Sequence, residues 1–283
     1  MASDNRFAVL IDADNVSVKY IKIILDEISK DGIATYKRIY GDWTNPSLIS
    51  WKSVLLDNSI NPIQQYSYTT GKNSTDSAMI IDAMDILYSG KVDGFCLVAS
   101  DSDFTRLAAR LRESGMTVIG MGESKTPNSF IAACNKFKYL DILSAADEEE
   151  PEETPAPKPE PAKKAAPQKK AAAAKKAKEE PKPEKEQKAE PKRQQQEEIE
   201  EPRTSLRTIR RALRTIVREN SDEDDWIIIG KIGNLLDKRY PDFDVRNFGF
   251  SKLTPFLESL DMFEIRDMKK DGNSSPQKYV RLK

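Results

Sequence analysis

The chain has 283 residues, with 45 lysines and arginines against 46 aspartates and glutamates, and it contains no histidine. This length suits one or two domains, and the lack of histidine excludes Ser-His-Asp and Cys-His catalysis. The two cysteines, Cys96 and Cys134, form no CxxC spacing for a zinc or redox site, so we expect buried, reduced thiols. The sequence has no apolar run of about 20 residues, so it predicts no membrane span. The N-terminus lacks signal-peptide features. We therefore expect a cytoplasmic protein.

Charge and proline divide the chain into three segments. Residues 1–143 carry 15 basic and 17 acidic residues, residues 144–202 carry 13 and 16, and residues 203–283 carry 17 and 13. The middle segment holds ten of the 16 prolines and no aromatic residue, so it cannot bury enough apolar area to offset the entropy of ordering. We predict a disordered charged linker, rich in Pro, Ala, Lys and Glu, between two folded domains.

The first segment alternates between strand and helix patterns. Helix-like stretches end at Gly32, Gly90 and Gly115, and strand-like stretches lie between them. This alternation predicts an α/β fold with a mostly parallel central sheet. In chain order, we expect strands at 6–11, 34–40, 61–68, 94–100 and 117–122, and helices at 16–32, 46–58, 75–90, 102–115 and 127–135.

Acidic residues follow the first and fourth predicted strands. Asp12 and Asp14 come after the first strand, and Asp101 and Asp103 after the fourth. In such sheets, ligands bind outside the carboxyl ends of the strands, where the strand order reverses. A strand order of 3-2-1-4-5 would bring these four carboxylates together.

A further carboxylate comes from the helix at 75–90. Ser74 and Thr75 are candidate N-caps, which would place Asp76 in the first turn. Asp82 lies about 240° further round the helix, so it is a weaker candidate. Singly, each aspartate could equally cap a helix or be solvated at a strand end, and Asp103 could cap a helix beginning at Phe104. Taken together, the aspartates favour a site.

Clustered ionised carboxylates need a cation to compensate their charge. Oxygen ligands without histidine or cysteine suit Mg²⁺ or Mn²⁺, and such an ion can activate water for attack on a phosphodiester. Other phosphate-binding motifs are missing, since neither GxxxxGK[ST] nor GxGxxG occurs. The stretch IDADNV does match the DxDx[TV] start of haloacid dehalogenase-type phosphatases. In that lower-ranked alternative, Asp12 would be the nucleophile and Asp14 the acid.

Four stretches carry a family resemblance over residues 5–143: VLIDADNVS, STDSAMIIDAMDIL, LVASDSDFTRLAARLRESGMTVIGMGES and FIAACNKFKYLD. They resemble the successive motifs of the NYN domain, a PIN-like family that includes the LabA-type bacterial proteins. The resemblance implies a PIN-like three-layer fold and, in active members, metal-dependent ribonuclease chemistry. It points to Asp12, Asp76, Asp101 and Asp103 as the acidic residues, with Asn15 and Ser100 as polar helpers.

The segment 203–283 resembles the LOTUS domain, also called OST-HTH, above all in RYPDFDVRNFGFSKLTPFLES. That implies a small winged helix of three helices followed by a β-hairpin around KKDGNSS. Members of this family bind RNA, and some animal members bind a helicase, so a protein partner is an alternative. Candidate RNA-binding residues are an arginine stripe and three further basic residues: Arg207, Arg210, Arg211 and Arg214, with Lys231, Arg246 and Lys252. Four aromatic residues are expected to pack in the core: Tyr240, Phe243, Phe248 and Phe250.

These observations lead us to expect a ribonuclease dependent on Mg²⁺ or Mn²⁺, tethered to an RNA-binding winged helix. Asp12 and Asp101 would hold the metal, and Asp76 and Asp103 would act as further ligands or as a base for the water. The main alternative is an RNA-binding regulatory adaptor whose NYN domain does not cut.

Overall fold

A computed structural model describes residues 5–66, 74–148, 204–268 and 276–283. The expected linker from residue 149 onward lies outside the described residues, as does the expected hairpin tip at 269–275.

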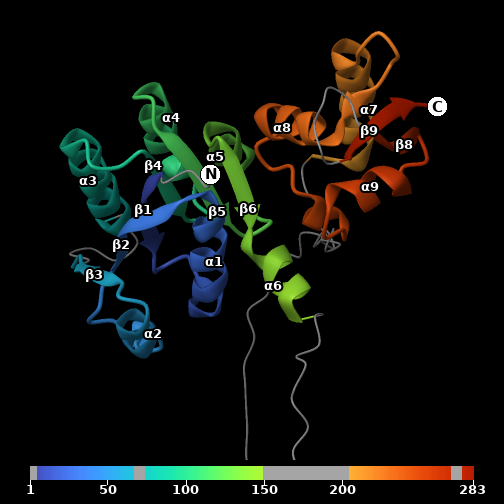
Figure 1. The fold of residues 1–283 in the computed structure, drawn as a ribbon. Coiled ribbons are helices and arrows are strands. Elements are labelled where there is room, and N and C mark those ends of the chain that lie inside the picture. Colours follow the sequence, from blue (N-terminus) through green and yellow to red (C-terminus); the bar gives the residue numbers. More distant parts are fainter. Residues whose placement is uncertain (1–4, 67–73, 149–203, 269–275) are drawn as a thin grey trace, which may run out of the picture. The chain divides into compact units, whose positions relative to one another are not determined.

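The N-terminal domain is built on a sheet of six parallel strands, coloured blue to yellow-green in Figure 1. The strand order is β3-β2-β1-β4-β5-β6, which confirms the predicted order of the first five. The residues KFKY form a sixth strand, which the sequence does not predict. The strands are β1 (Arg6–Asp12), β2 (Ile33–Gly41), β3 (Asn61–Gln64), β4 (Gly94–Val98), β5 (Thr117–Gly122) and β6 (Lys136–Tyr139).

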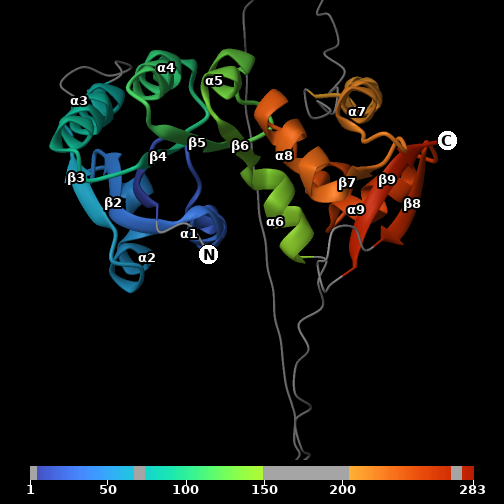
Figure 2. The same ribbon diagram turned by 45° about the horizontal axis from the view of Figure 1, so that its top comes forward.

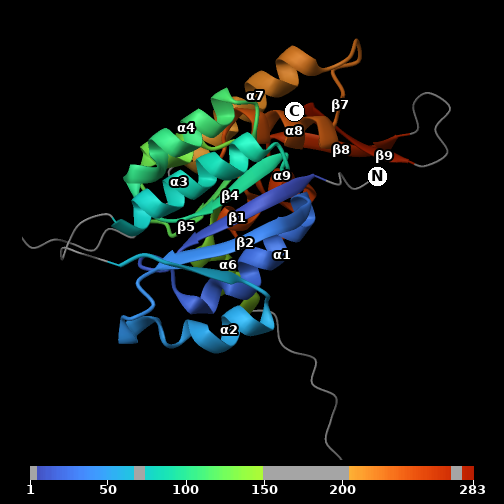
Figure 3. The same ribbon diagram turned by 90° about the vertical axis from the view of Figure 1, so that its left-hand side faces the viewer.

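Helices cover both faces of this sheet. Figure 2 shows α3, α4 and α5 along one face, and Figure 3 shows α1 and α2 on the opposite face. Gly90 and Gly115 have φ angles of 65° and 82° directly after two of these helices, which favours glycine there. The last helix runs beyond the expected domain boundary at residue 143. The helices are α1 (Ile21–Asp31), α2 (Trp51–Asp57), α3 (Ser74–Ser89), α4 (Thr105–Glu113), α5 (Asn128–Ala133) and α6 (Leu140–Glu148), with short 3₁₀ turns η1 (Val18–Tyr20), η2 (Pro46–Leu48) and η3 (Ser102–Phe104).

The two-residue alternation of the strands sorts side chains into two cores. Along β1, Val9 and Ile11 pack in one apolar cluster with α1, whereas Ala8 and Leu10 pack in the other with α3 and α4. Asp12 continues the second series, so its side chain lies on the α3 and α4 face. This parity decides which helices can contribute to a site at the end of β1.

The C-terminal domain has three helices and a small antiparallel sheet of order β7-β9-β8, coloured orange to red in Figure 1. Leu213, Ile232, Phe256 and Val280 lie in its core, and the four predicted core aromatics pack against them. Helices and a hairpin therefore appear in the predicted order. The elements are α7 (Leu206–Asn220), β7 (Ile227–Ile228), α8 (Ile229–Arg239), η4 (Val245–Phe248), α9 (Leu253–Ser259), β8 (Phe263–Met268) and β9 (Gln277–Leu282).

In the parts of the chain that the structure describes, no helix has both the length and the apolar character that crossing a membrane requires. Cys96 and Cys134 are both free and buried, and burial raises the pKa of each thiol.

Candidate functional site

The candidate site lies at the carboxyl edge of the parallel sheet, at the ends of β1 and β4. Ile11 of β1 is paired with Val98 of β4, so the segments that follow these two residues leave the sheet side by side. Asp12 is the last residue of β1, and Asp101 comes three residues after the end of β4. The reversal of strand order predicted from the sequence is therefore present at this edge.

Asp101 fixes the turn that follows β4. It is the N-cap of η3, and its Oδ1 accepts a hydrogen bond of 2.9 Å from the backbone N–H of Asp103. The cap of this turn is therefore Asp101, and not Asp103 as one of the sequence alternatives had it. This bond occupies one oxygen of Asp101 and orients the other.

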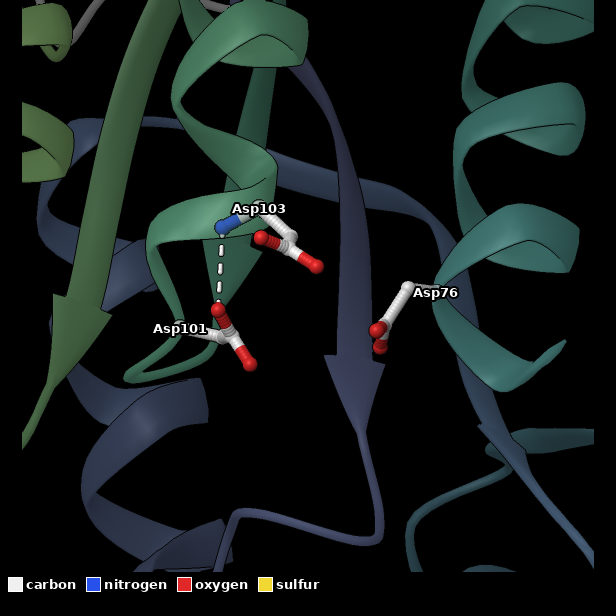
Figure 4. A group of neighbouring side chains, drawn as sticks. All are labelled: Asp76, Asp101 and Asp103. Atoms are coloured by element: carbon white, nitrogen blue, oxygen red, sulfur yellow. Dashed lines mark hydrogen bonds between the residues drawn. The ribbon is translucent and has the colours of Figure 1, made fainter. Parts of the chain in front are cut away.

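Three carboxylates from two elements meet at this edge. Asp76 lies in the first turn of α3, as predicted, and is buried. Each of Asp76, Asp101 and Asp103 offers an oxygen, and these oxygens all lie within 4.8 Å of one another. Figure 4 shows Asp76 reaching from α3 toward the space that Asp101 and Asp103 face from the turn after β4.

The electrostatics of this group show that its members repel one another. The pKa of Asp76 is raised from 3.8 to about 6, first by burial and then by the charges of Asp12, Asp101, Asp103 and Asp14. Burial and like charge both disfavour the ionised form of a carboxylate. A bound cation would relieve both effects.

Asp12 is close enough to influence Asp76 but is not a member of the group of three. It is fully buried, and both of its oxygens accept hydrogen bonds from its own loop. The backbone N–H of Asp14 donates to Oδ1 at 3.0 Å, and Nδ2 of Asn15 donates to Oδ2 at 2.7 Å. Burial raises the pKa of Asp12, and these bonds oppose the rise. In the described structure, Asn15 therefore acts by orienting Asp12.

A hydrogen bond connects the loop after β1 to the start of α3. Oγ1 of Thr75 donates to Oδ2 of Asp14 at 2.8 Å. Thr75 lies inside α3, which begins at Ser74, so of the two predicted caps Thr75 is ruled out. The bond holds the first turn of α3, which carries Asp76, against the end of β1.

Ser100 supports the neighbouring strand end. Its Oγ accepts a hydrogen bond of 3.0 Å from the backbone N–H of Glu123, which follows β5. The hydroxyl of Tyr20 donates to Oε1 of Glu123 at 3.1 Å. The sequence analysis missed Glu123 and Tyr20, because nothing in their spacing links them to the aspartates.

The C-terminal domain presents most of its candidate RNA-binding residues on its surface. Of the seven, all but Arg246 are exposed, on α7, on α8 and next to α9. Arg246 is only partly exposed and donates hydrogen bonds to both oxygens of Asp244. It is therefore occupied within its own domain, and we leave it out of the proposed RNA surface.

Comparisons with known proteins find two families in this chain. The family model of the NYN domain matches residues 6–141, and that of the OST-HTH/LOTUS domain matches residues 203–274. No curated protein matches the chain. The combined matches show that this chain carries an NYN domain, of PIN-like nuclease type, in its N-terminal half.

Two solved structures are similar to parts of the chain. One is the crystal structure of a protein of unknown function from Vibrio parahaemolyticus RIMD 2210633, which is 19% identical, with a TM-score of 0.42. The match covers 50% of this chain and 97% of that protein. The other is the solution structure of an uncharacterized protein from Nitrosomonas europaea, 26% identical, with a TM-score of 0.25, over 35% of this chain and 91% of that one. By its two family matches, the chain is an NYN domain protein with a C-terminal OST-HTH/LOTUS domain.

Proposed function

We propose that the NYN domain hydrolyses RNA phosphodiesters with the help of Mg²⁺ or Mn²⁺ held by Asp76, Asp101 and Asp103. The observation that carries this proposal is the convergence of three carboxylate oxygens, within 4.8 Å of one another, at the carboxyl edge of the sheet. Carboxylate oxygens are the ligands that these hard cations prefer. The raised pKa of Asp76 supports the fit, because it reflects burial first and then the uncompensated negative charge of the neighbouring carboxylates, both of which a bound cation would offset. When bound, such an ion lowers the pKa of a water molecule and neutralises charge that develops on the phosphate.

Each carboxylate of the site is positioned by its own contacts and is assigned its own role. Asp101 is held by its cap bond to the turn, and Asp76 by the helix start that Thr75 ties to Asp14. Asp103 is the most exposed of the three, so we assign to its second oxygen, the one that does not bind the ion, the role of accepting the proton of the attacking water. Asp12 remains in the proposed site as a buried carboxylate next to the three ligands. Its charge contributes to the raised pKa of Asp76.

RNA affinity would come from the OST-HTH/LOTUS domain. The proposed contacts are the exposed arginines of α7, supported by Lys231 and Lys252. Joining this domain to the nuclease domain raises the effective concentration of RNA near the site without any new contact. The two free buried thiols are consistent with the cytoplasm as the place of action.

The geometry does not favour the phosphatase alternative. A nucleophilic carboxylate needs an oxygen that can reach phosphorus, but Asp12 is fully buried and both of its oxygens accept hydrogen bonds. Asp14, the acid in that scheme, accepts a hydrogen bond from Thr75. Rapid hydrolysis of p-nitrophenyl phosphate would reverse this ranking.

A cleavage assay with the full chain tests the proposal. End-labelled RNA and DNA are incubated with Mg²⁺ or Mn²⁺, with and without a chelator, and RNA cleavage should require the metal. Asp101→Asn should lower the rate at least about 100-fold, as expected for loss of a group that orients the reactants. Its matched control is Asp85→Asn, an exposed aspartate of α3 outside the group, which should cut like the wild type.

The same assay separates the nuclease from the adaptor. RNA binding without metal-dependent cleavage in the wild type would support the regulatory adaptor, which acts through RNA or a protein partner. Cleavage that survives Asp101→Asn would show that the acidic group is not the active site.

A further inference from the structure

We infer that the OST-HTH/LOTUS domain binds the backbone of double-helical RNA along the arginine face of α7, without reading bases. This inference rests on the proposed RNA-directed function and specifies which surface and which class of RNA are involved. It is carried by the placement of charge on α7, by the composition of α9 and by the packing of the aromatic residues against the core of the domain.

The arginines of α7 form one continuous stripe. At 100° per residue, Arg207, Arg210, Arg211, Arg214 and Arg218 fall within an arc of about 100°, and they extend over about 16 Å of the helix. All five are exposed, whereas Ile209, Leu213, Ile216 and Val217 on the other side are buried. The helix is therefore fixed by its apolar side and presents a straight row of guanidinium groups.

The charge of this row is available to a ligand. Among the described residues, no ion pair is found between an arginine of α7 and a carboxylate, and only Arg210 is tied back, to the carbonyl of Leu260 at 3.2 Å. Elsewhere in the domain, Arg246 is paired with Asp244, Arg266 and Arg281 with Glu264, Lys278 with Asp267, and Lys283 with Asp261. Lys231, Lys238, Arg239 and Lys252 are exposed as well, but among the described residues of the domain the largest group of exposed basic residues on one element lies along α7.

The helix that usually reads bases in helix-turn-helix proteins is unsuited to that task here. In that motif, the recognition helix lies in the major groove and contacts base edges with its side chains. By its place after α8, this helix is α9, which has seven residues, LTPFLES, without a basic side chain. Its exposed positions include Glu258, which would repel phosphates.

The domain also lacks the apparatus for single strands in the part that the structure describes. Proteins that bind single strands stack bases on exposed aromatic rings. Here the rings of Phe243, Phe248 and Phe250 pack around Phe256, and Trp226 is buried beneath the guanidinium groups of Arg266 and Arg281. The exposed groups that remain to bind RNA are the basic side chains, and positive charge binds phosphate.

A duplex fits a row of cations better than a single strand does. Double-stranded nucleic acid carries about one charge per 1.7 Å of its axis, against about one per 3.4 Å for each strand. Double-stranded RNA is recognised mainly by shape and by contacts to phosphates and 2′-hydroxyls. A basic helix face without base-reading side chains suits this mode of binding.

Three variants test the inference, in the full chain carrying Asp101→Asn so that the RNA is not cut. The first changes Arg207, Arg211 and Arg214 to Gln, and the second changes Lys231 and Lys252 to Gln. The control changes Lys238, Arg239 and Lys278 to Gln, all of them exposed and off the α7 face. Gln is close to Arg in helix propensity, so α7 should be retained, which circular dichroism verifies. Probes are a labelled 20-base-pair RNA duplex and each of its single strands.

We expect the duplex to bind more tightly than either strand, with little change when its sequence is scrambled. The α7 variant should bind it at least about 10-fold more weakly and lower the salt slope of log K by about 2 to 3, since each lost phosphate contact removes about 0.7 to 0.9. The control should change affinity less than about 3-fold.

Several results would overturn the inference. Tighter binding of the single strands would show that double-helical RNA is not the preferred ligand. A larger loss of affinity in the lysine variant than in the α7 variant would place the binding surface on α8 and the start of α9 instead of on α7. Equal competition by polyglutamate would identify an acidic protein as the partner. RNA cleavage by the wild type is measured separately, so the nuclease proposal can stand even where duplex binding fails.

Discussion

The hydroxyl of Tyr40 on β2 donates a hydrogen bond to the carboxylate of Asp82 on α3. The guanidinium of Arg38, two residues earlier on the same strand, binds the other oxygen of Asp82. Tyr40 is the register partner of Asp12, and its backbone carbonyl accepts a 2.9 Å hydrogen bond from Ala13. Tyr40 therefore connects the end of β1 with the helix whose first turn carries Asp76. Asp82 acts by holding α3 on the sheet, on a different side of the helix from the acidic group.

Removing the Tyr40 hydroxyl should loosen the attachment of α3. Tyr40→Phe deletes a buried hydrogen bond to a charged group, so we expect a loss of about 1.5 to 3 kcal/mol in the free energy of unfolding. Because α3 also positions Asp76, Mn²⁺ affinity measured by calorimetry should fall several-fold. Tyr88→Phe, at an exposed tyrosine of the same helix, should change neither quantity. A stability loss with unchanged Mn²⁺ affinity would show that the bond stabilises the fold without positioning the site.

Neutralising Asp76 should stabilise the metal-free protein above pH 6. An unfolded Asp76 ionises near pH 3.8, whereas the folded one keeps its proton up to about pH 6. Between these values the folded state binds more protons, so the wild-type free energy of unfolding falls as pH rises from about 4 to about 6. Asp76→Asn removes this loss and should gain on the order of 2 kcal/mol at pH 7 and almost nothing at pH 4.

Urea unfolding across this pH range in the presence of a chelator measures the difference. Asp85→Asn, at an exposed aspartate of the same helix outside the acidic group, serves as the control for removing a carboxylate from α3. Saturating Mn²⁺ should erase the advantage of Asp76→Asn, because the ion stabilises the wild type more than a variant with one ligand fewer. An advantage that persists in Mn²⁺ would argue that Asp76 does not bind the ion.

Gly122 leaves room for the turn that carries Asp101. A Cβ at this position would lie 2.6 Å from the carbonyl of Ala99 and 3.0 Å from Oγ of Ser100. Gly122→Ala should therefore displace the segment before Asp101 and lower both Mn²⁺ affinity and the cleavage rate by about 10-fold, given the sensitivity of catalysis to such shifts. Gly230→Ala is the control, since nothing lies within 4 Å of a Cβ there. Unchanged cleavage by Gly122→Ala would mean that the turn tolerates displacement.

Local sequence patterns are sufficient to predict much of the fold. Strand and helix periodicities, together with glycines after helices, predicted the alternation of elements and a strand order that the structure confirms. The sequence does not predict the strand at Lys136–Tyr139, because four residues carry too little periodicity to mark a strand. The pairing of Arg246 with Asp244 could not be foreseen either, since charge spacing alone does not tell an ion pair from an exposed base.

The sequence by itself indicated that carboxylates must carry most of any chemistry here, because the chain has no histidine, and that a strand order of 3-2-1-4-5 would bring them to one sheet edge. Only the tertiary structure decided which of them meet. Asp12 and Asp101 follow neighbouring strands, yet Asp12 is turned into its own loop by two hydrogen bonds. Asp76, more than 60 residues away from Asp12 in the chain, takes its place beside Asp101 and Asp103 because helix packing and the Thr75–Asp14 bond bring α3 to that edge. The docking of α3 at that edge depends on contacts between residues far apart in the sequence, which local sequence patterns do not encode.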